Sequence, residues 1–184
     1  QRLYNHSLYN SERILQENAR YGYAIAMDDD RLVVSGSEWV DPDQLYAAWV
    51  YKRNTTGTWD LTAKLFEPNL EKRRAATGFG NAVSIDNDTV VIGAQRDSEA
   101  GTHAGSVYVF QKDPGDNVET WTLKTKILPA GLSMHDYFGI SVSIHGDQFI
   151  SGQKSSERYK TKCGRAYIYK KNAATGNWDF QQNI

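Results

Sequence analysis

Bulky and small side chains alternate along three segments of the chain, residues 21–27, 79–85 and 138–144. In each segment the first, fifth and seventh residues are bulky, and the second, fourth and sixth are Gly, Ala or Ser. An alternation with a period of two predicts a β-strand. A face made only of small residues predicts close approach to another sheet, because a face toward water would carry charged side chains.

The three segments mark an internal repeat. Each begins with an aromatic residue followed by Gly, and these glycines are separated by 58 and 59 positions. Each unit continues with an Asp-containing turn, a second apolar strand, a connection of about ten residues, an aromatic-rich third strand and a fourth strand that begins at Trp. The repeated residues are Tyr21, Gly22, Phe79, Gly80, Phe138 and Gly139, the turn residues Asp30, Asp88 and Asp147, and Trp59, Trp121 and Trp178.

Four antiparallel strands in a unit of this length predict an all-β fold made of β-propeller blades. We expect blade 1 over residues 19–68, blade 2 over 69–130 and blade 3 over 131–184. Residues 1–18 are expected to hold the last strand of a preceding blade and a linker. Three blades are fewer than the four to eight of closed propellers. The chain is therefore expected to be part of a larger propeller or to be completed by other chains.

These motifs resemble those of a known family. Phe79-Gly80 followed by Val91-Ile92-Gly93-Ala94 resembles the FG-GAP repeat of integrin α-subunit propellers, and the resemblance covers residues 8–184. The other two copies carry Ser35-Gly36 and Ser151-Gly152 in place of Gly-Ala. The resemblance implies an extracellular or cell-surface location and a role in adhesion, ligand binding or protein assembly.

Some members of that family bind Ca²⁺, and here the sequence departs from them. A calcium site needs a loop that supplies six or more oxygen ligands. The corresponding segments here are tight turns such as Asp28-Asp29-Asp30, whose adjacent carboxylates are expected to point apart. We therefore expect the variant without the calcium loop, with no metal site and no cofactor.

Charge and composition limit the classes of partner that we expect. The formal net charge is −1, which gives no electrostatic reason to expect nucleic acid as a partner. No apolar run is long enough for a membrane span. Cys163 is the only cysteine, so no internal disulfide is expected.

Residues for catalysis are not found. The sequence contains no nucleophile elbow, no phosphate-binding glycine loop and no zinc-binding His-Glu helix motif. The four histidines are far apart in the sequence and fall on loops or turns. We therefore expect a binding or building module rather than an enzyme, and no catalytic residue. Any catalysis would belong to a hydrolase domain outside this chain.

Candidate sites lie on turns and loops. Sequons predict N-glycosylation at Asn5, Asn54 and Asn87. The long connections between second and third strands are residues 37–46, 95–105 and 153–164. By analogy with the family they share one face of the propeller and bind partners. The candidate binding residues on them are Trp39, Arg96, His103, Arg158 and Tyr159.

Two classes of function remain open from the sequence. The first is an extracellular propeller module that recognises a protein or a glycan, as in adhesion. The second is a structural subunit, in which propeller blades of several copies or segments build a filament or a coat.

Overall fold

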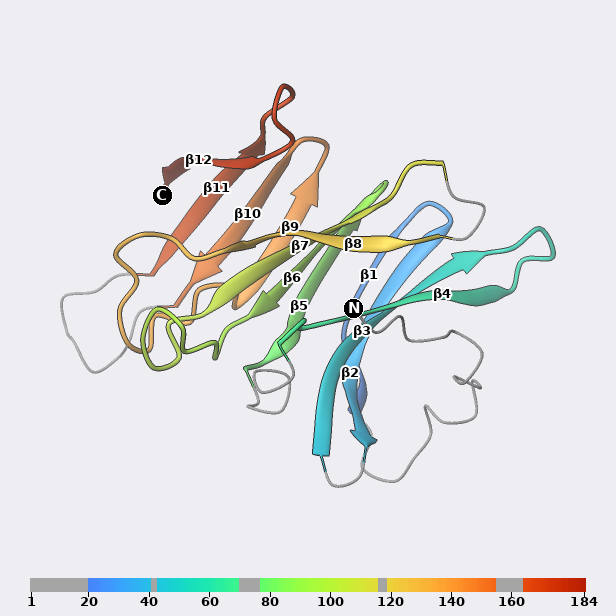
Figure 1. Ribbon diagram of the computed structural model, residues 1–184, viewed down its shortest axis with the longest axis horizontal. Helices are drawn as coiled ribbons and strands as arrows, with labels where there is room; N and C mark the ends of the chain where they lie inside the picture. Colours follow the sequence, from blue (N-terminus) through green and yellow to red (C-terminus); the bar gives the residue numbers. More distant parts are fainter. Residues whose placement is uncertain (1–19, 41–42, 70–76, 116–118, 155–163) are drawn as a thin grey trace.

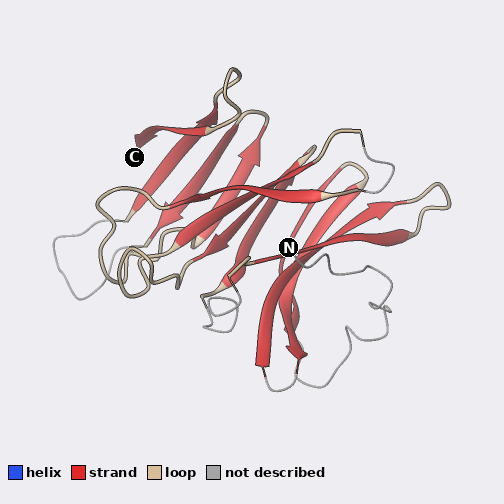
Figure 2. Ribbon diagram, viewed as in Figure 1, coloured by secondary structure: helices blue, strands red, loops and turns tan. Residues whose placement is uncertain are grey.

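The computed structural model describes residues 20–40, 43–69, 77–115, 119–154 and 164–184. The described residues form twelve strands and no helix (Figure 2). The strands make three four-stranded antiparallel sheets, each in sequence order. The predicted all-β architecture of blade-like sheets is confirmed. Sheet 1 contains β1 (Arg20–Asp28), β2 (Arg31–Val40), β3 (Asp43–Arg53) and β4 (Trp59–Phe66). Sheet 2 contains β5 (Phe79–Asp86), β6 (Thr89–Ala94), β7 (Ser106–Lys112) and β8 (Trp121–Ile127). Sheet 3 contains β9 (Ser141–His145), β10 (Gln148–Gln153), β11 (Arg165–Lys171) and β12 (Trp178–Asn183).

The three sheets lie side by side with sheet 2 in the middle (Figure 1). The first strands of the sheets, β1, β5 and β9, are neighbours along one side. The β1–β2, β5–β6 and β9–β10 turns lie at one end of the sheets, which we call the hairpin end. The second strands end and the third strands begin at the other end, which we call the loop end. Residues 1–18, the predicted strand of a preceding blade, are outside the described residues.

The turns at the hairpin end are tight, as predicted, but have two residues rather than the predicted three, because the first residue of each predicted turn still belongs to the first strand. The first turn residue has a positive φ, 47° at Asp29, 50° at Asn87 and 59° at Gly146. These are residue types that tolerate left-handed backbone. The carbonyl oxygen of the second turn residue accepts a hydrogen bond from the backbone N–H at the end of the third strand. This bond joins Asp30 to Arg53, Asp88 to Lys112 and Asp147 to Lys171. The repeated Asp thus marks the place where three strands of a sheet are tied together.

The aromatic-Gly pair has the same structure in all three repeats. Gly22, Gly80 and Gly139 have φ values of 86°, 85° and 83°. In sheets 1 and 2 the strand register shifts there, as in a β-bulge. Only Gly adopts such a φ without strain. The aromatic residue before each Gly packs on an aromatic residue of the third strand, with ring centroids 5.2 Å apart in each of the pairs Tyr21–Trp49, Phe79–Tyr108 and Phe138–Tyr167.

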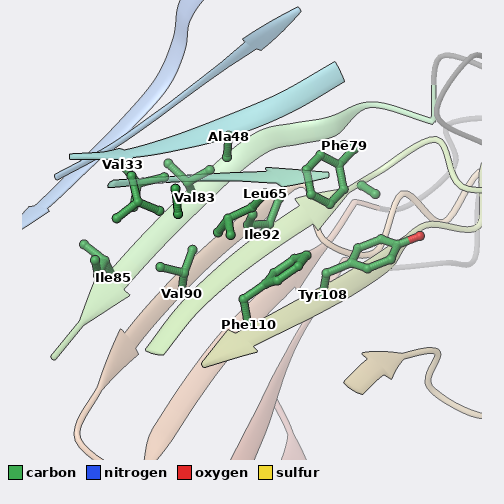
Figure 3. Packing of buried hydrophobic residues seen from close by; sticks show 13 residues of the cluster. Val33, Ala48, Leu65, Phe79, Val83, Ile85, Val90, Ile92, Tyr108 and Phe110 are labelled. Atoms are coloured by element: carbon green, nitrogen blue, oxygen red, sulfur yellow. The ribbon is translucent and has the colours of Figure 1, made fainter. Parts of the chain in front are cut away.

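The hydrophobic core lies between the sheets rather than within one of them. Sheet 1 contributes smaller residues such as Val33, Ala48 and Leu65, and sheet 2 contributes larger residues such as Phe79 and Tyr108 to the same cluster (Figure 3). The opposite face of sheet 2 packs on sheet 3 in a second cluster with the same pairing of small and large residues. A sheet therefore needs a neighbour on each side to bury both faces.

Two of the sheets approach so closely that a side chain would not fit between them. A Cβ atom on Gly93 of sheet 2 would lie 2.0 Å from the carbonyl oxygen of Gly139 in sheet 3. In sheet 1 the corresponding residue is Ser35, and its hydroxyl donates a 2.6 Å hydrogen bond to the carbonyl oxygen of Gly80. Each junction is thus closed by backbone contact or by one small hydroxyl.

A second device joins the sheets at the hairpin end. The Asp28 carboxylate at the end of β1 accepts a 2.6 Å hydrogen bond from the backbone N–H of Asn87 in the next turn. Asp86 at the end of β5 likewise accepts a 2.5 Å hydrogen bond from Gly146. In sheets 1 and 2 the first strand therefore binds the hairpin turn of the next sheet.

We predict that Gly93→Ala lowers the free energy of unfolding by about 1–3 kcal/mol, because the added methyl group collides with the backbone of sheet 3. The measurement is urea unfolding followed by tryptophan fluorescence. The control is Gly152→Ala. Gly152 pairs with the second residue after Gly139, as Gly93 does with the second residue after Gly80, so the sequence alignment of Ser151 with Gly93 was wrong by one residue. A Cβ atom on Gly152 would meet only the Ser141 hydroxyl, at 2.5 Å, and that hydroxyl can rotate away. Equal losses for the two variants would contradict the close approach.

Candidate functional site

The loop between β6 and β7 is held by a buried carboxylate. Asp97 is 1% exposed, and its side chain accepts hydrogen bonds from the Glu99 backbone N–H at 3.0 Å and from the Ser106 hydroxyl at 2.8 Å. The Lys126 ammonium lies 2.5 Å from the same carboxylate. Buried charge paired in this way fixes the path of the loop. Asp97 was not predicted as a site residue from the sequence. Its position in the predicted connection, four residues after Gly93, was the signal that could have indicated it.

The same loop joins sheet 2 to sheet 3 at the loop end. The backbone N–H of His135 donates to the carbonyl of Thr102 at 2.8 Å, and that of Tyr137 donates to the carbonyl of His103 at 3.1 Å. The rings of His103, His135 and Tyr137 form one cluster, with centroids 5.4–6.0 Å apart. All three residues have positive φ, 53°, 62° and 52°. Such backbone persists only where surrounding contacts hold it.

A pocket of about 120 Å³ opens at the loop end between sheets 1 and 2. Its lining combines two arginines, two tyrosines, polar amides and glycines. The lining residues are Arg20, Tyr23, Gly36, Ser37, Tyr46, Gly78, Phe79, Gly80, Asn81, Gln95 and Arg96. Arg96 was predicted as a binding residue from the sequence. Arg20 and Tyr23 were not, because β1 was interpreted only as a packing strand.

The pocket exists because one repeat position differs between the sheets. In sheet 2 the second residue after the aromatic is Asn81, whose amide donates to the carbonyls of Gly139 and Ile140 at 3.1 Å each. Its side-chain oxygen accepts from the Gln95 backbone N–H at 2.9 Å. These bonds close the junction with sheet 3. The same position in sheet 1 is Tyr23, which is 61% exposed and cannot bridge in this way.

Both arginines of the pocket are available to a ligand. Arg20 and Arg96 are exposed, and within the described part of the chain neither guanidinium has an ion pair or a side-chain hydrogen bond. The acidic residues beside the lining in sequence are used elsewhere. Glu38 pairs with Lys64, and Asp97 pairs with Lys126. Among the described residues, therefore, no neighbouring carboxylate neutralises the positive charge of the pocket.

The other predicted binding residues have different outcomes. The prediction of a long loop over residues 37–46 is wrong. β2 and β3 stay paired as far as Val40 and Asp43, because both strands carry strand-favouring residues in this stretch, Trp39 and Val40 in β2 and Tyr46 in β3. Trp39 accordingly lies within β2 rather than on a loop. Arg158 and Tyr159 are outside the described residues.

The sequons also differ from one another. Asn5 is outside the described residues. The Asn54 side-chain oxygen accepts hydrogen bonds from the backbone N–H groups of Thr56 and Thr58 at 3.0 Å, so this side chain organises its own turn. Asn87 is exposed at the tip of the β5–β6 turn, while Thr89 of its sequon is buried.

The described residues contain neither a metal-binding cluster nor a helix that could span a membrane. Within the described ranges, no group of three or more His, Cys, Asp or Glu side chains is arranged to hold a metal ion. In the first turn, Asp28 accepts the bond from Asn87, and Asp30 pairs with Arg31 at 3.3 Å. No described element is a helix of the length and hydropathy needed to cross a membrane.

The repeated sheets, the aromatic-Gly bulges and the inter-sheet core define a protein built of β-propeller blades. The model of the FG-GAP repeat matches residues 59–110 and 121–169, more than half of the chain, and the chain belongs to this family. Each matched segment begins at the Trp of one sheet's last strand and continues into the next sheet.

Comparison with solved structures agrees on the fold. Two crystal structures of the Sqt1 propeller from Chaetomium thermophilum superimpose with a TM-score of 0.56 at 12% sequence identity. The match covers 90% of this chain and 36% of Sqt1, so the chain spans about a third of that protein. At this identity the likeness concerns the fold alone. None of the curated proteins compared with the chain matches it.

We predict that Asn81→Ala lowers the free energy of unfolding by about 1–3 kcal/mol, because two carbonyl groups and one N–H lose their partner. Tyr23→Ala, at the same position in sheet 1, is the matched control and should cost less than about 1 kcal/mol. Both values come from urea unfolding curves. If Tyr23→Ala were the more destabilising variant, the junction between sheets 1 and 2 would not be open as described.

Proposed function

We propose that the chain is an extracellular or cell-surface recognition module that binds a protein or glycan partner at its loop end, as in adhesion. The observation that carries the proposal is the pocket between sheets 1 and 2, where Arg20 and Arg96 have no partner among the described residues. Unpaired guanidinium groups beside tyrosines are typical of protein interfaces. The module acts by binding, not by catalysis.

The two ends of the sheets differ in a way that supports this assignment. At the hairpin end, Asp28 and Asp86 bind the turns of the following sheets. At the loop end, Asp97 and the His103 cluster hold the connections in place. A rigid scaffold with exposed polar loops is a common arrangement for binding sites. The exposed sequon residue Asn87 is compatible with a secreted protein.

The proposal is tested by screening the purified chain against extracellular matrix proteins and a glycan array. Any ligand is then measured with the loop-end variant Arg96→Glu/His103→Ala and the hairpin-end control Lys112→Ala/Lys170→Ala. We expect binding at least about tenfold weaker for the loop-end variant, a loss of about 1.4 kcal/mol, and little change for the control. The proposal would be contradicted if only the hairpin-end control lost binding, or if the chain bound neither a matrix protein nor a glycan on the array.

A second candidate is a structural subunit, and the outer sheet faces favour it. On sheet 1, Ile25 and Met27 are 74% and 70% exposed, although they alternate like core residues. On sheet 3, Ile150 is 38% exposed beside a shallow hollow that also contains Ser143 and Ile168. On sheet 3, Ile150 and Ile168 pair as Val33 and Val50 do on the face of sheet 1 that packs against sheet 2, so the two outer faces correspond to faces that meet between neighbouring sheets. Another copy could therefore join sheet 3 to sheet 1.

We predict for this candidate a mass above 20.8 kDa that rises with concentration in sedimentation equilibrium. The variant Ile25→Ser/Met27→Ser should remain a monomer, because burial of exposed apolar area drives such association. The control Lys124→Ser on β8 should associate normally. A monomer mass at all concentrations for the unmodified chain would contradict the structural role.

A further inference from the structure

Charge decides which ligands suit the pocket between sheets 1 and 2. Arg20 comes from β1 and Arg96 from the β6–β7 loop, and the described lining residues include no Asp or Glu. Two positive groups that share a pocket repel one another, and an anion between them removes this cost. The planar fork of N–H donors on guanidinium matches the two oxygens of a carboxylate.

The volume of the pocket limits the size of the group that it can bind. The pocket volume of about 120 Å³ is well below the roughly 300–1,000 Å³ of sites that enclose whole small molecules. It accommodates the tip of one side chain. A ligand of this kind must belong to a larger partner that rests on the surrounding loops.

The walls complement a carboxylate at the end of a short side chain. Tyr23 and Tyr46 supply aromatic surface, and their hydroxyls can donate hydrogen bonds. Both arginines are exposed, so an approaching anion can reach them directly. Long-range attraction of an acidic partner raises the association rate.

We propose that this pocket binds the carboxylate of a Glu or Asp side chain in an acidic segment of a protein partner, held by Arg20 and Arg96. This inference rests on the proposed function, because it assumes that the loop end is the binding surface. It adds the chemistry of the partner and two residues that hold it.

The experiment is an NMR titration of the ¹⁵N-labelled chain with a capped peptide, Gly-Glu-Gly-Glu-Gly, and with its Gln counterpart. We expect saturable shifts of the Nε–Hε signals of Arg20 and Arg96 with the Glu peptide, and binding at least about tenfold weaker with the Gln peptide. Arg20→Ala/Arg96→Ala should weaken binding of the Glu peptide by about tenfold or more. The control Arg53→Ala/Arg165→Ala removes two exposed arginines outside the pocket and should leave binding unchanged.

A second variant keeps both arginines. Tyr23→Asn introduces into sheet 1 the amide that closes the junction between sheets 2 and 3, and it should also weaken binding of the Glu peptide. Unfolding curves of all variants verify that they are folded. Higher sodium chloride should weaken binding, since exposed charges are screened.

Several results would overturn the inference. These are equal binding of the two peptides, shifts of the same size at Arg53 and Arg165, or no saturable shift. Tighter binding of a chondroitin sulfate disaccharide than of the Glu peptide, lost in Arg20→Ala/Arg96→Ala, would assign the pocket to an acidic glycan instead. If the ligand screen finds a partner that depends on the loop end while the Glu peptide fails, only this inference falls and the recognition function stands.

Discussion

The packing of a small-residue face of one sheet against a bulky face of the next is the constraint on which the structure depends. Gly93 lies so close to the Gly139 carbonyl that a methyl group would not fit, and Ser35 takes the same place between sheets 1 and 2. This spacing places Phe79, Val83 and Ile85 of sheet 2 in one cluster with Val33 and Ala48 of sheet 1. The sheets gain their apolar burial from one another, so the repeat is stable only as a stack.

The junction between sheets 1 and 2 and the junction between sheets 2 and 3 have the same kind of packing, but they differ at the loop end. Between sheets 2 and 3, Asn81 bridges backbone carbonyls, and His103 packs with the rings of His135 and Tyr137. Between sheets 1 and 2, Tyr23 leaves a pocket in which Arg20 and Arg96 have no described partner. The repeat thus forms a specific site because one position, Asn81 in sheet 2 and Tyr23 in sheet 1, differs between sheets of the same architecture.

Much of the fold could be predicted because its signals are local and occur three times. The glycine at 22, 80 and 139 requires a positive φ, and the Trp at the start of each fourth strand falls where β4, β8 and β12 begin. The first connection was wrongly predicted. In length and position residues 37–46 resemble the other two connections, so the sequence did not distinguish them. Their strand pairing depends on cross-strand contacts such as the 2.8 Å hydrogen bond from Gln44 to Ser37.

The sequence by itself determined the strand order, the hairpin turns, the alternation of small and bulky faces and the FG-GAP family, because each follows from residue type and spacing. Only the tertiary structure decided which side chains meet. Arg20 and Arg96 are 76 positions apart and belong to different sheets, and they share a pocket because sheet 1 stacks on sheet 2. His103 and His135, far apart in the chain, meet because backbone hydrogen bonds join their loops. Contacts between sheets depend on distance in space, which a repeat period does not contain.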